Sequence, residues 1–216
     1  EPREIGGAVV LFDDVGIDRT LSDYRHTSRV LLAVGGKEYV EEVCKSFYPE
    51  KNSGNNDNTN NNNSPLADSL ADVDVLVVPV LIEPSTTTNN NNDANQFNVA
   101  DTRACWKNAI PATVAAATEG DNNLDDIFLT GDASSVLAFP RAFASWSEYL
   151  QPEIETATKQ GFDVLNKGFT ITVKKNGRIL RRTTGLPQWT DFISTMEVMD
   201  GSKFGMPGDS KIYEKV

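Results

Sequence analysis

The feature of this chain that most constrains its fold is the segment 169–193, FTITVKKNGRILRRTTGLPQWTDFI. Apolar side chains alternate with threonines over Phe169–Val173, which is the pattern of a β-strand with two distinct faces. Asn176-Gly177 follows and favours a type I′ turn, because both central residues of that turn have positive φ. Residues 179–180 are again apolar and continue a return strand. The segment therefore predicts a β-hairpin.

A helix is predicted directly after this hairpin. Gly185 ends the second strand, and Pro187 fits the first turn of a helix, where an amide donor is not needed. The predicted helix has one continuous apolar face. The residues of that face are Trp189, Phe192, Ile193, Met196 and Met199.

Two buried strands and a helix are predicted upstream. Val73–Ile82 is an apolar run rich in β-branched residues, typical of a strand buried on both faces, so Pro79 must lie at a bulge, an end or an unpaired edge. Arg29–Val34 predicts a second buried strand, and Gly7–Val15 is a candidate for an additional one. The helix predicted after Arg29–Val34 has an apolar face made of Tyr39, Val40, Val43, Cys44 and Phe47.

A further helical stretch lies between these strands and the hairpin. Trp146, Tyr149, Leu150 and Ile154 have helical spacing, and Pro152 is expected to begin the second of two helical pieces. The order of elements is then strand, helix, strand, helix, hairpin, helix. Strands and helices that alternate in this way predict an α/β domain.

Two asparagine-rich segments interrupt this pattern. Asn52–Asn63 holds eight asparagines in twelve residues, and Ser85–Asn98 is similar. Such polar sequence cannot repay the entropy of ordering, so both are expected to be loops or disordered insertions within one domain. The predicted organisation is an N-terminal extension over 1–28 with a possible extra strand, a domain over 29–199 with insertions at 49–72 and 83–99, and an extended C-terminal tail over 200–216.

The charge of the chain is unevenly distributed. Residues 1–150 carry 23 acidic and 10 basic side chains, a net charge of −13, which argues against general nucleic-acid binding. No apolar run is long enough for a transmembrane helix. The predicted hairpin is basic and is interpreted either as a solvated hairpin or as a docking face for an acidic protein or lipid surface. Its basic residues are Lys174, Lys175, Arg178, Arg181 and Arg182.

The order of elements over Arg29–Met199 resembles that of the thioredoxin family, which implies a thioredoxin-like mixed sheet flanked by helices. Thioredoxin-like enzymes carry reactive cysteines where the first core strand meets its helix, and a cis-proline just before the third core strand. Here the junction is Gly35-Gly36-Lys37-Glu38, and the sequence before the third strand is LNKG. Both features are missing, so the chain is predicted not to be an enzyme.

The remaining candidate chemical groups are sparse. Cys44 lies on the apolar face of its helix and is expected to be inert, and Cys105 has no partner two residues away. Two cysteines suit a reducing compartment, and a bridge between them stays open. His26 is the sole histidine, so no metal or other cofactor is predicted. The acidic pairs Asp13-Asp14 and Asp125-Asp126 are interpreted as solvated turns.

A closer resemblance concerns residues 160–192, QGFDVLNKGFTITVKKNGRILRRTTGLPQWTDF. This segment is similar to thioredoxin-like plastid proteins that lack the reactive cysteines: low-photosystem-II-accumulation-type assembly factors, and nucleus-encoded photosystem I accessory subunits of red-lineage algae. The resemblance implies a non-enzymatic subunit on the stromal face of the thylakoid membrane, with photosystem subunits as partners and no membrane span of its own. A start at Glu1 is interpreted as the result of leader removal.

Two surfaces are expected to bind the partner. One is the basic hairpin. The other is the tail, which either packs on its own domain or binds along the partner through its apolar residues Phe204, Met206, Ile212 and Tyr213. The alternatives are a soluble oxidoreductase of the thioredoxin or peroxiredoxin family that uses Cys105 or Cys44, and a soluble chaperone.

Overall fold

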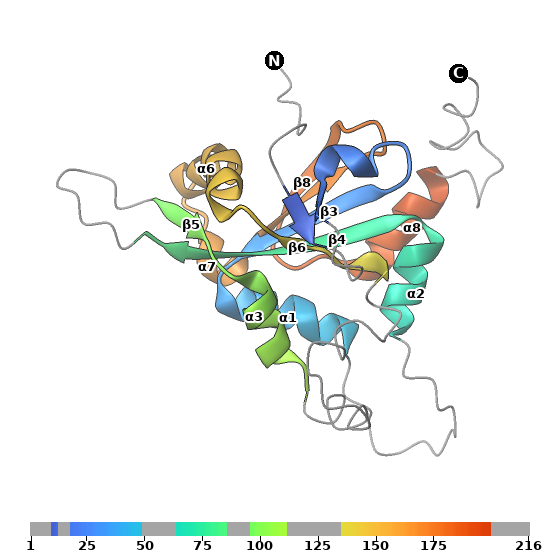
Figure 1. Ribbon diagram of the computed structural model, residues 1–216, viewed down its shortest axis with the longest axis horizontal. Coiled ribbons are helices and arrows are strands. Elements are labelled where there is room, and N and C mark those ends of the chain that lie inside the picture. The colour runs from blue at the N-terminus through green and yellow to red at the C-terminus, as the bar shows by residue number, and fades with distance from the viewer. Residues whose placement is uncertain (1–9, 13–17, 49–63, 86–95, 112–134, 200–216) are drawn as a thin grey trace.

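The computed structural model describes residues 10–12, 18–48, 64–85, 96–111 and 135–199 (Figure 1). The predicted tail with Phe204, Met206, Ile212 and Tyr213, both acidic pairs and most of the two asparagine-rich segments lie outside these residues. The architecture of the chain is defined for the described residues only.

A five-stranded mixed sheet forms the centre of the fold, with the strand order β5-β4-β3-β7-β8. β3 (Arg29–Gly35) and β4 (Val75–Pro84) are parallel, and β7 (Phe169–Val173) runs antiparallel to β3. β8 (Ile179–Thr184) completes the hairpin with β7, and β5 (Phe97–Val99) pairs with the end of β4. A parallel pair next to an antiparallel hairpin is the thioredoxin-like arrangement, so the predicted fold class is confirmed.

Helices cover both faces of this sheet, as Figure 1 shows. α6 (Phe143–Lys159), the short α7 (Val164–Lys167) and a 3₁₀ turn at Leu21–Tyr24 pack against one face. The opposite face is covered by α1 (Lys37–Phe47), α2 (Pro65–Asp72), α3 (Thr102–Ala109) and α8 (Trp189–Met199).

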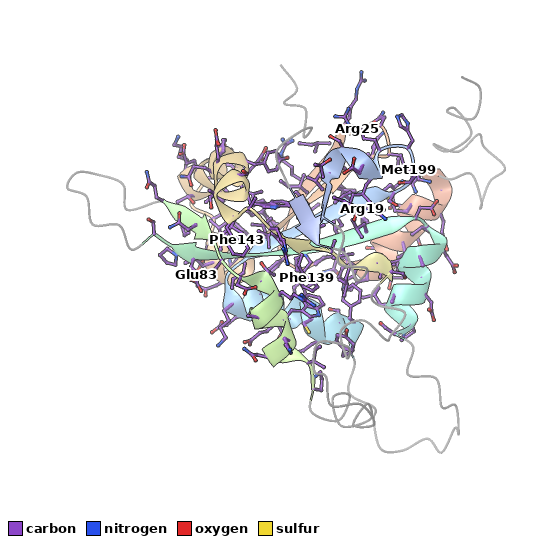
Figure 2. All side chains as sticks on the ribbon, in the orientation of Figure 1. Arg19, Arg25, Glu83, Phe139, Phe143 and Met199 are labelled. Carbon is purple, nitrogen blue, oxygen red and sulfur yellow. The ribbon has the colours of Figure 1, made fainter. Side chains whose placement is uncertain are left out.

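The strand β3 explains why two hydrophobic layers exist. All seven of its residues are buried, and successive side chains point to opposite faces. Leu32 and Val34 contribute to the α6 layer, whereas Leu31 and Ala33 contribute to the α1 layer. The side chains fill the space on both sides of the sheet (Figure 2).

A second, smaller sheet has the strand order β2-β1-β6. Its strands are β1 (Val10–Phe12), β2 (Asp18–Thr20) and β6 (Phe139–Pro140). β1 falls inside the extra strand predicted for the N-terminal extension. Phe139, labelled in Figure 2, contacts Trp106 of α3 edge-on, with 5.8 Å between the ring centroids. A bridge between Leu137 and Val77 connects this region to the edge of β4.

Pro79 lies in the middle of β4, opposite Ala33 of β3. The other edge of β4 is paired at Val77 and again from Ile82 onwards, so Pro79 falls in the gap between these pairings. Because the proline nitrogen cannot donate, an unpaired stretch of edge is where proline costs least. This is the third of the three placements expected from the sequence.

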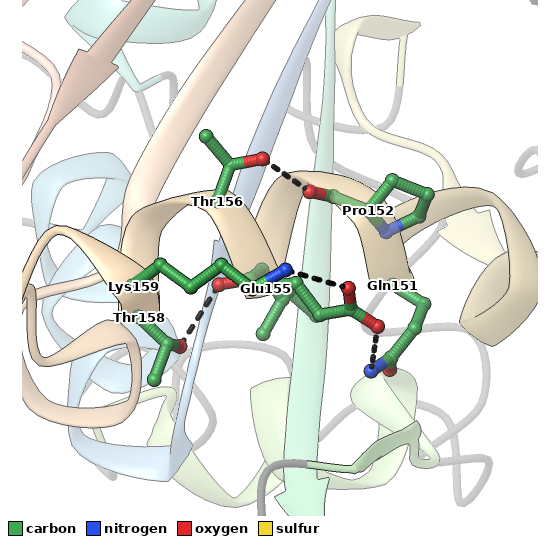
Figure 3. Close-up of polar contacts among 7 residues, drawn as sticks. Gln151, Pro152, Glu155, Thr156, Thr158 and Lys159 are labelled. Atoms are coloured by element: carbon green, nitrogen blue, oxygen red, sulfur yellow. Dashed lines mark hydrogen bonds and ion pairs between the residues drawn. The ribbon is translucent and has the colours of Figure 1, made fainter.

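The expectation that Pro152 divides two helical pieces is wrong, because α6 is one continuous helix with Pro152 inside it. Trp146, Leu150 and Ile154 are fully buried in the same core layer on both sides of the proline. The free energy gained by burying these three side chains exceeds the free energy lost with the one backbone hydrogen bond that proline removes. The hydroxyl of Thr156 donates to the Pro152 carbonyl at 2.7 Å (Figure 3).

Pro152→Ala is expected to raise the free energy of unfolding by about 1–2 kcal/mol, because alanine restores the missing amide donor and removes the ring clash. Urea denaturation followed by circular dichroism measures this. Pro65→Ala is the matched control, since Pro65 occupies the first turn of α2, where proline is not penalised. An equal gain in both variants would contradict the explanation.

The hairpin between β7 and β8 is present, but its turn is not of type I′. Gly177 alone of its residues has positive φ, at 80°, and its amide donates to the Lys174 carbonyl at 2.8 Å. The Lys174 amide in turn donates to the Arg178 carbonyl. This is a three-residue loop, in which a type I turn is followed by a left-handed glycine. The longer loop explains why Asn176 does not need positive φ.

Helix α2 and strand β5 were not expected. Both form where the sequence predicts insertions, at 49–72 and 83–99. The Ser64 hydroxyl accepts from the Ala67 amide and so caps α2, and Pro65 provides its first turn. Ala67 and Leu70 are fully buried. Helix α2 therefore belongs to the domain although it directly follows the first asparagine-rich segment in sequence.

Candidate functional site: the junction of β3 and α1

The junction of β3 and α1 is the place where thioredoxin-like enzymes carry their reactive cysteines. In this chain it is closed by backbone contacts. The amide of Gly36 donates to the carbonyl of Leu165, in α7, at 2.8 Å. A Cβ at Gly36 would lie 2.8 Å from the same carbonyl oxygen. The junction thus offers neither a thiol nor room for one at this position.

The side chain of Tyr39 fills the space beside this junction. Its ring lies against Gly35 at the end of β3 and against Gly168 just before β7, and a Cβ at either glycine would overlap the ring. The Tyr39 hydroxyl donates to the carbonyl of Gly185 at 3.2 Å. Burial raises the pKa of Tyr39 well above its ordinary value, so the ring stays neutral. One aromatic side chain therefore contacts three segments of the chain, at Gly35, Gly168 and Gly185.

Gly168 is the residue directly before β7, where thioredoxin-like enzymes have their cis-proline. Its φ is +59°, and no cis peptide bond occurs in the described segments. A glycine with positive φ therefore stands at the place of the cis-proline, and the Tyr39 ring packs against it. This explains in structural terms why the sequence LNKG has no proline.

A pocket of about 660 Å³ lies next to Tyr39, between α1, α7 and the loop from β8 to α8. The α1 side carries Glu38, Glu41 and Glu42. Lys45 neutralises Glu42 through a 2.6 Å contact between its Nζ and the carboxylate. The described residues around this pocket include no cysteine, histidine or serine. Its lining is instead rich in charged side chains, with three glutamates from α1 and the lysines Lys45 and Lys167.

Both cysteines are buried on the α1 side of the sheet. Cys44 is 0% exposed, and its thiol contacts the Trp106 carbonyl at 3.7 Å. Burial, and secondarily the neighbouring Cys105, raise the pKa of Cys44 to about 12. Burial also raises the pKa of Cys105, which lies on α3. The expected burial of Cys44 on the apolar face of its helix is confirmed, and neither thiol is bridged.

The native thiols are expected to react with a disulfide reagent at pH 8 at least 100-fold more slowly than in the denatured chain. With a pKa of about 12, only about one Cys44 in 10⁴ is a thiolate at that pH. Release of thionitrobenzoate with and without guanidinium measures the ratio. The single variants Cys44→Ala and Cys105→Ala separate the two thiols. Rapid reaction of either thiol in the native chain would show that it is reactive.

The five basic residues of the hairpin do not form one surface. Lys175, expected on the docking face, is only 2% exposed, so its assignment to an exposed surface is wrong. Its ammonium group contacts the Asp74 carboxylate at 2.7 Å. The peptide carbonyl of Lys175 accepts from the His26 amide at 2.8 Å. Lys175 therefore anchors the hairpin to neighbouring turns.

Arg181 and Arg182 point to opposite faces of the sheet. Arg182 forms two 2.7 Å hydrogen bonds to Glu153 of α6. The Arg181 guanidinium lies 5.5 Å from the ring centroid of Phe192 in α8. Their pairing partners in β7 are the adjacent residues Ile171 and Thr172, which also alternate. The basic residues are close together in the sequence. Because successive side chains of a strand point to opposite faces, their charge is divided between the two faces of the sheet.

One basic residue near the hairpin was missed. Arg25, which is partly exposed and is labelled in Figure 2, lies against the turn, where a Cβ on Gly177 would come within 2.7 Å of its Nε. No sequence signal near Arg25 indicates this contact. His26 is exposed, as expected.

The described helices include none that is long and apolar enough to cross a membrane. Among the same residues, no group of three or more His, Cys, Asp or Glu side chains is arranged to hold a metal ion. Both findings concern only the part of the chain that the structure describes.

No protein-family model and no curated protein matches the chain. Among solved structures it is similar to the mitochondrial 2-Cys peroxiredoxin of Plasmodium falciparum, at 10% identity and a TM-score of 0.48, over 94% of this chain and 96% of that one. For the reduced 2-Cys peroxiredoxin of Plasmodium vivax these values are 10%, 0.43, 91% and 80%. For a putative electron transfer protein from Aquifex aeolicus they are 9%, 0.41, 90% and 95%. Likenesses this distant say nothing of activity.

Proposed function

We propose that this chain is a non-enzymatic accessory or assembly subunit that docks on the stromal side of a photosynthetic thylakoid complex, most specifically photosystem I. The observation that carries the non-enzymatic part is the position of Tyr39. The Tyr39 ring lies against Gly35 and Gly168 and its hydroxyl donates to Gly185, so a buried tyrosine stands where thioredoxin-like enzymes have their reactive groups. A domain with this scaffold and no thiol at this place is proposed to act by presenting surfaces.

The hairpin supports the docking part of the proposal. Lys174, Arg178 and Arg181 have no acidic partner among the described residues, although the chain as a whole carries a net charge of −11. Unpaired cations on an acidic protein attract an acidic partner to the place where they lie. The assignment to the plastid and to a photosystem rests on the resemblance of residues 160–192.

The proposal is tested by capture from native thylakoid membranes with the tagged chain, washed at low and then high salt. Stoichiometric recovery of photosystem subunits, weakened by salt and by Arg178→Glu, is the expected result. Lys37→Glu is the matched control, because Lys37 is an exposed lysine at the start of α1, which follows the end of β3 farthest from the hairpin turn. A monomeric chain that recovers no membrane subunit would refute the assignment.

A second candidate function is that of a thioredoxin-family oxidoreductase. It is favoured by the proximity of Cys44 and Cys105, which lie in one buried cluster on neighbouring helices, where Cys105 contributes to the raised pKa of Cys44. Insulin-disulfide reduction by the native chain, lost in the Cys44→Ala/Cys105→Ala double variant, would establish this function. Equal background rates in both proteins would exclude it.

A further inference from the structure

The strand β8 forms one edge of the five-stranded sheet. The strand pairs with β7 on one side, and no described strand pairs with it on its other side. The strand becomes more exposed towards its end, where Arg182, Thr183 and Thr184 are open to solvent. Every second residue of an edge strand directs its amide and carbonyl outwards, so β8 offers unpaired backbone donors and acceptors.

This edge is held in a fixed shape before any partner arrives. Ile179 packs against the α6 layer, and Leu180 packs against the α1 layer. A bulge at the level of Thr172 and Val173 lies at the start of β8, which leaves Arg181–Thr184 as a regular run. A preorganised strand loses little conformational entropy when another strand pairs with it.

Positive charge is concentrated at the turn end of this edge. Arg178 and Lys174 flank the turn, Arg25 lies against it, and Arg181 belongs to β8 itself. None of these four has an acidic partner among the residues that the structure describes. Arg182, by contrast, is neutralised by Glu153 and does not contribute to the local charge.

These charges determine which kind of strand can pair with the free side of β8. Antiparallel pairing of β8 with β8 of a second copy would place the arginines at the centre of both strands opposite each other, which is destabilising. The four cations do not attract a basic or uncharged strand. They attract a strand that carries carboxylates, and the acidic remainder of this chain repels such a strand from other surfaces.

We propose that the free edge of β8 binds an extended acidic segment of a partner protein by strand addition, with the surrounding cations fixing its position. This inference rests on the proposed docking function and specifies its mode. Backbone hydrogen bonds supply the affinity, and the cations supply selectivity for carboxylates over other side chains.

The test uses the full chain and an eight-residue peptide of alternating glutamate and valine. Calorimetry and ¹H–¹⁵N spectra are expected to show binding, with slowed hydrogen exchange of β8 amides. A peptide of the same sequence with alternate backbone amides methylated keeps its charge but cannot pair, and is expected to bind at least about tenfold more weakly. Arg178→Glu/Arg181→Glu is expected to weaken binding by about tenfold, and Lys37→Glu to leave it unchanged.

Equal binding of the methylated and unmethylated peptides would overturn strand addition. So would binding to vesicles of anionic phospholipid without binding to either peptide, or formation of a homodimer through β8. Capture from thylakoid membranes distinguishes the two proposals. Capture of photosystem subunits without protection of β8 amides refutes the inference and retains the function, whereas peptide binding without such capture refutes the function and retains the inference.

Discussion

Gly168→Ala is expected to lower the free energy of unfolding by about 3–5 kcal/mol, close to the total stability of many domains. Two costs combine. With φ at +59° and ψ at 175°, Gly168 has a backbone conformation that is essentially restricted to glycine and costs alanine roughly 1–3 kcal/mol, and the added Cβ overlaps the Tyr39 ring. Because the ring is held by Gly35 and Gly185 as well, it cannot move aside without opening the junction. Chemical denaturation measures the loss.

Two variants separate these costs. Gly161 also has a positive φ, +76°, but no atom lies within 4 Å of the position of its Cβ, so Gly161→Ala reports the cost of a positive φ without any overlap. Tyr39→Ala removes the ring and leaves a cavity, at about 3–5 kcal/mol. In the Gly168→Ala/Tyr39→Ala double variant the overlap is gone, so the combined loss should be smaller than the sum of the two single losses. Full additivity would mean that the ring does not restrict Gly168.

Asp74→Asn is expected to destabilise the chain by about 1–3 kcal/mol, and Lys175→Met by much less, although both remove the same ion pair. The two partners differ in exposure: the Lys175 side chain is 2% exposed and the Asp74 side chain 55%. Without Asp74 the ammonium group remains buried without a charged partner. Without Lys175 the carboxylate is simply solvated, and methionine fills the space of the lysine stem.

Asparagine is the right replacement at this position because Asp74 has a φ of +51°, which asparagine tolerates better than alanine. Urea denaturation of both single variants and the double variant measures the asymmetry. The double variant should be more stable than Asp74→Asn alone, since it no longer buries an unpaired charge. A greater loss in Lys175→Met than in Asp74→Asn would contradict this account.

Much of the fold could be predicted because burial leaves a periodic pattern in the sequence. The apolar faces of α1 and α8 and the alternation in β7 each appear in one short segment, and the structure has them where expected. The helix α2 was not predicted because it is short and adjoins an asparagine-rich segment. The prediction at Pro152 was wrong because local helix preference was weighed without the tertiary burial of α6.

The candidate site could be predicted only in part. The absence of a cysteine at Gly35-Gly36 is visible in the sequence, but the role of Tyr39 is not. It depends on Gly168 and Gly185, which are far away in the chain and meet Tyr39 only through the sheet. The hairpin charges show the same difficulty. Lys174 and Lys175 are neighbours in sequence, yet only the second is buried, with its ammonium group against the Asp74 carboxylate.

The central position of β3 has a consequence for how this chain folds during synthesis. One neighbour of β3, the strand β4, is made soon after it, but the other neighbour, β7, comes almost at the end of the described chain. Until β7 emerges, β3 has an apolar free edge that invites pairing with other chains. Native contacts so distant in sequence slow folding. Completion of the hairpin, rather than collapse of the first helices, should therefore limit the folding rate.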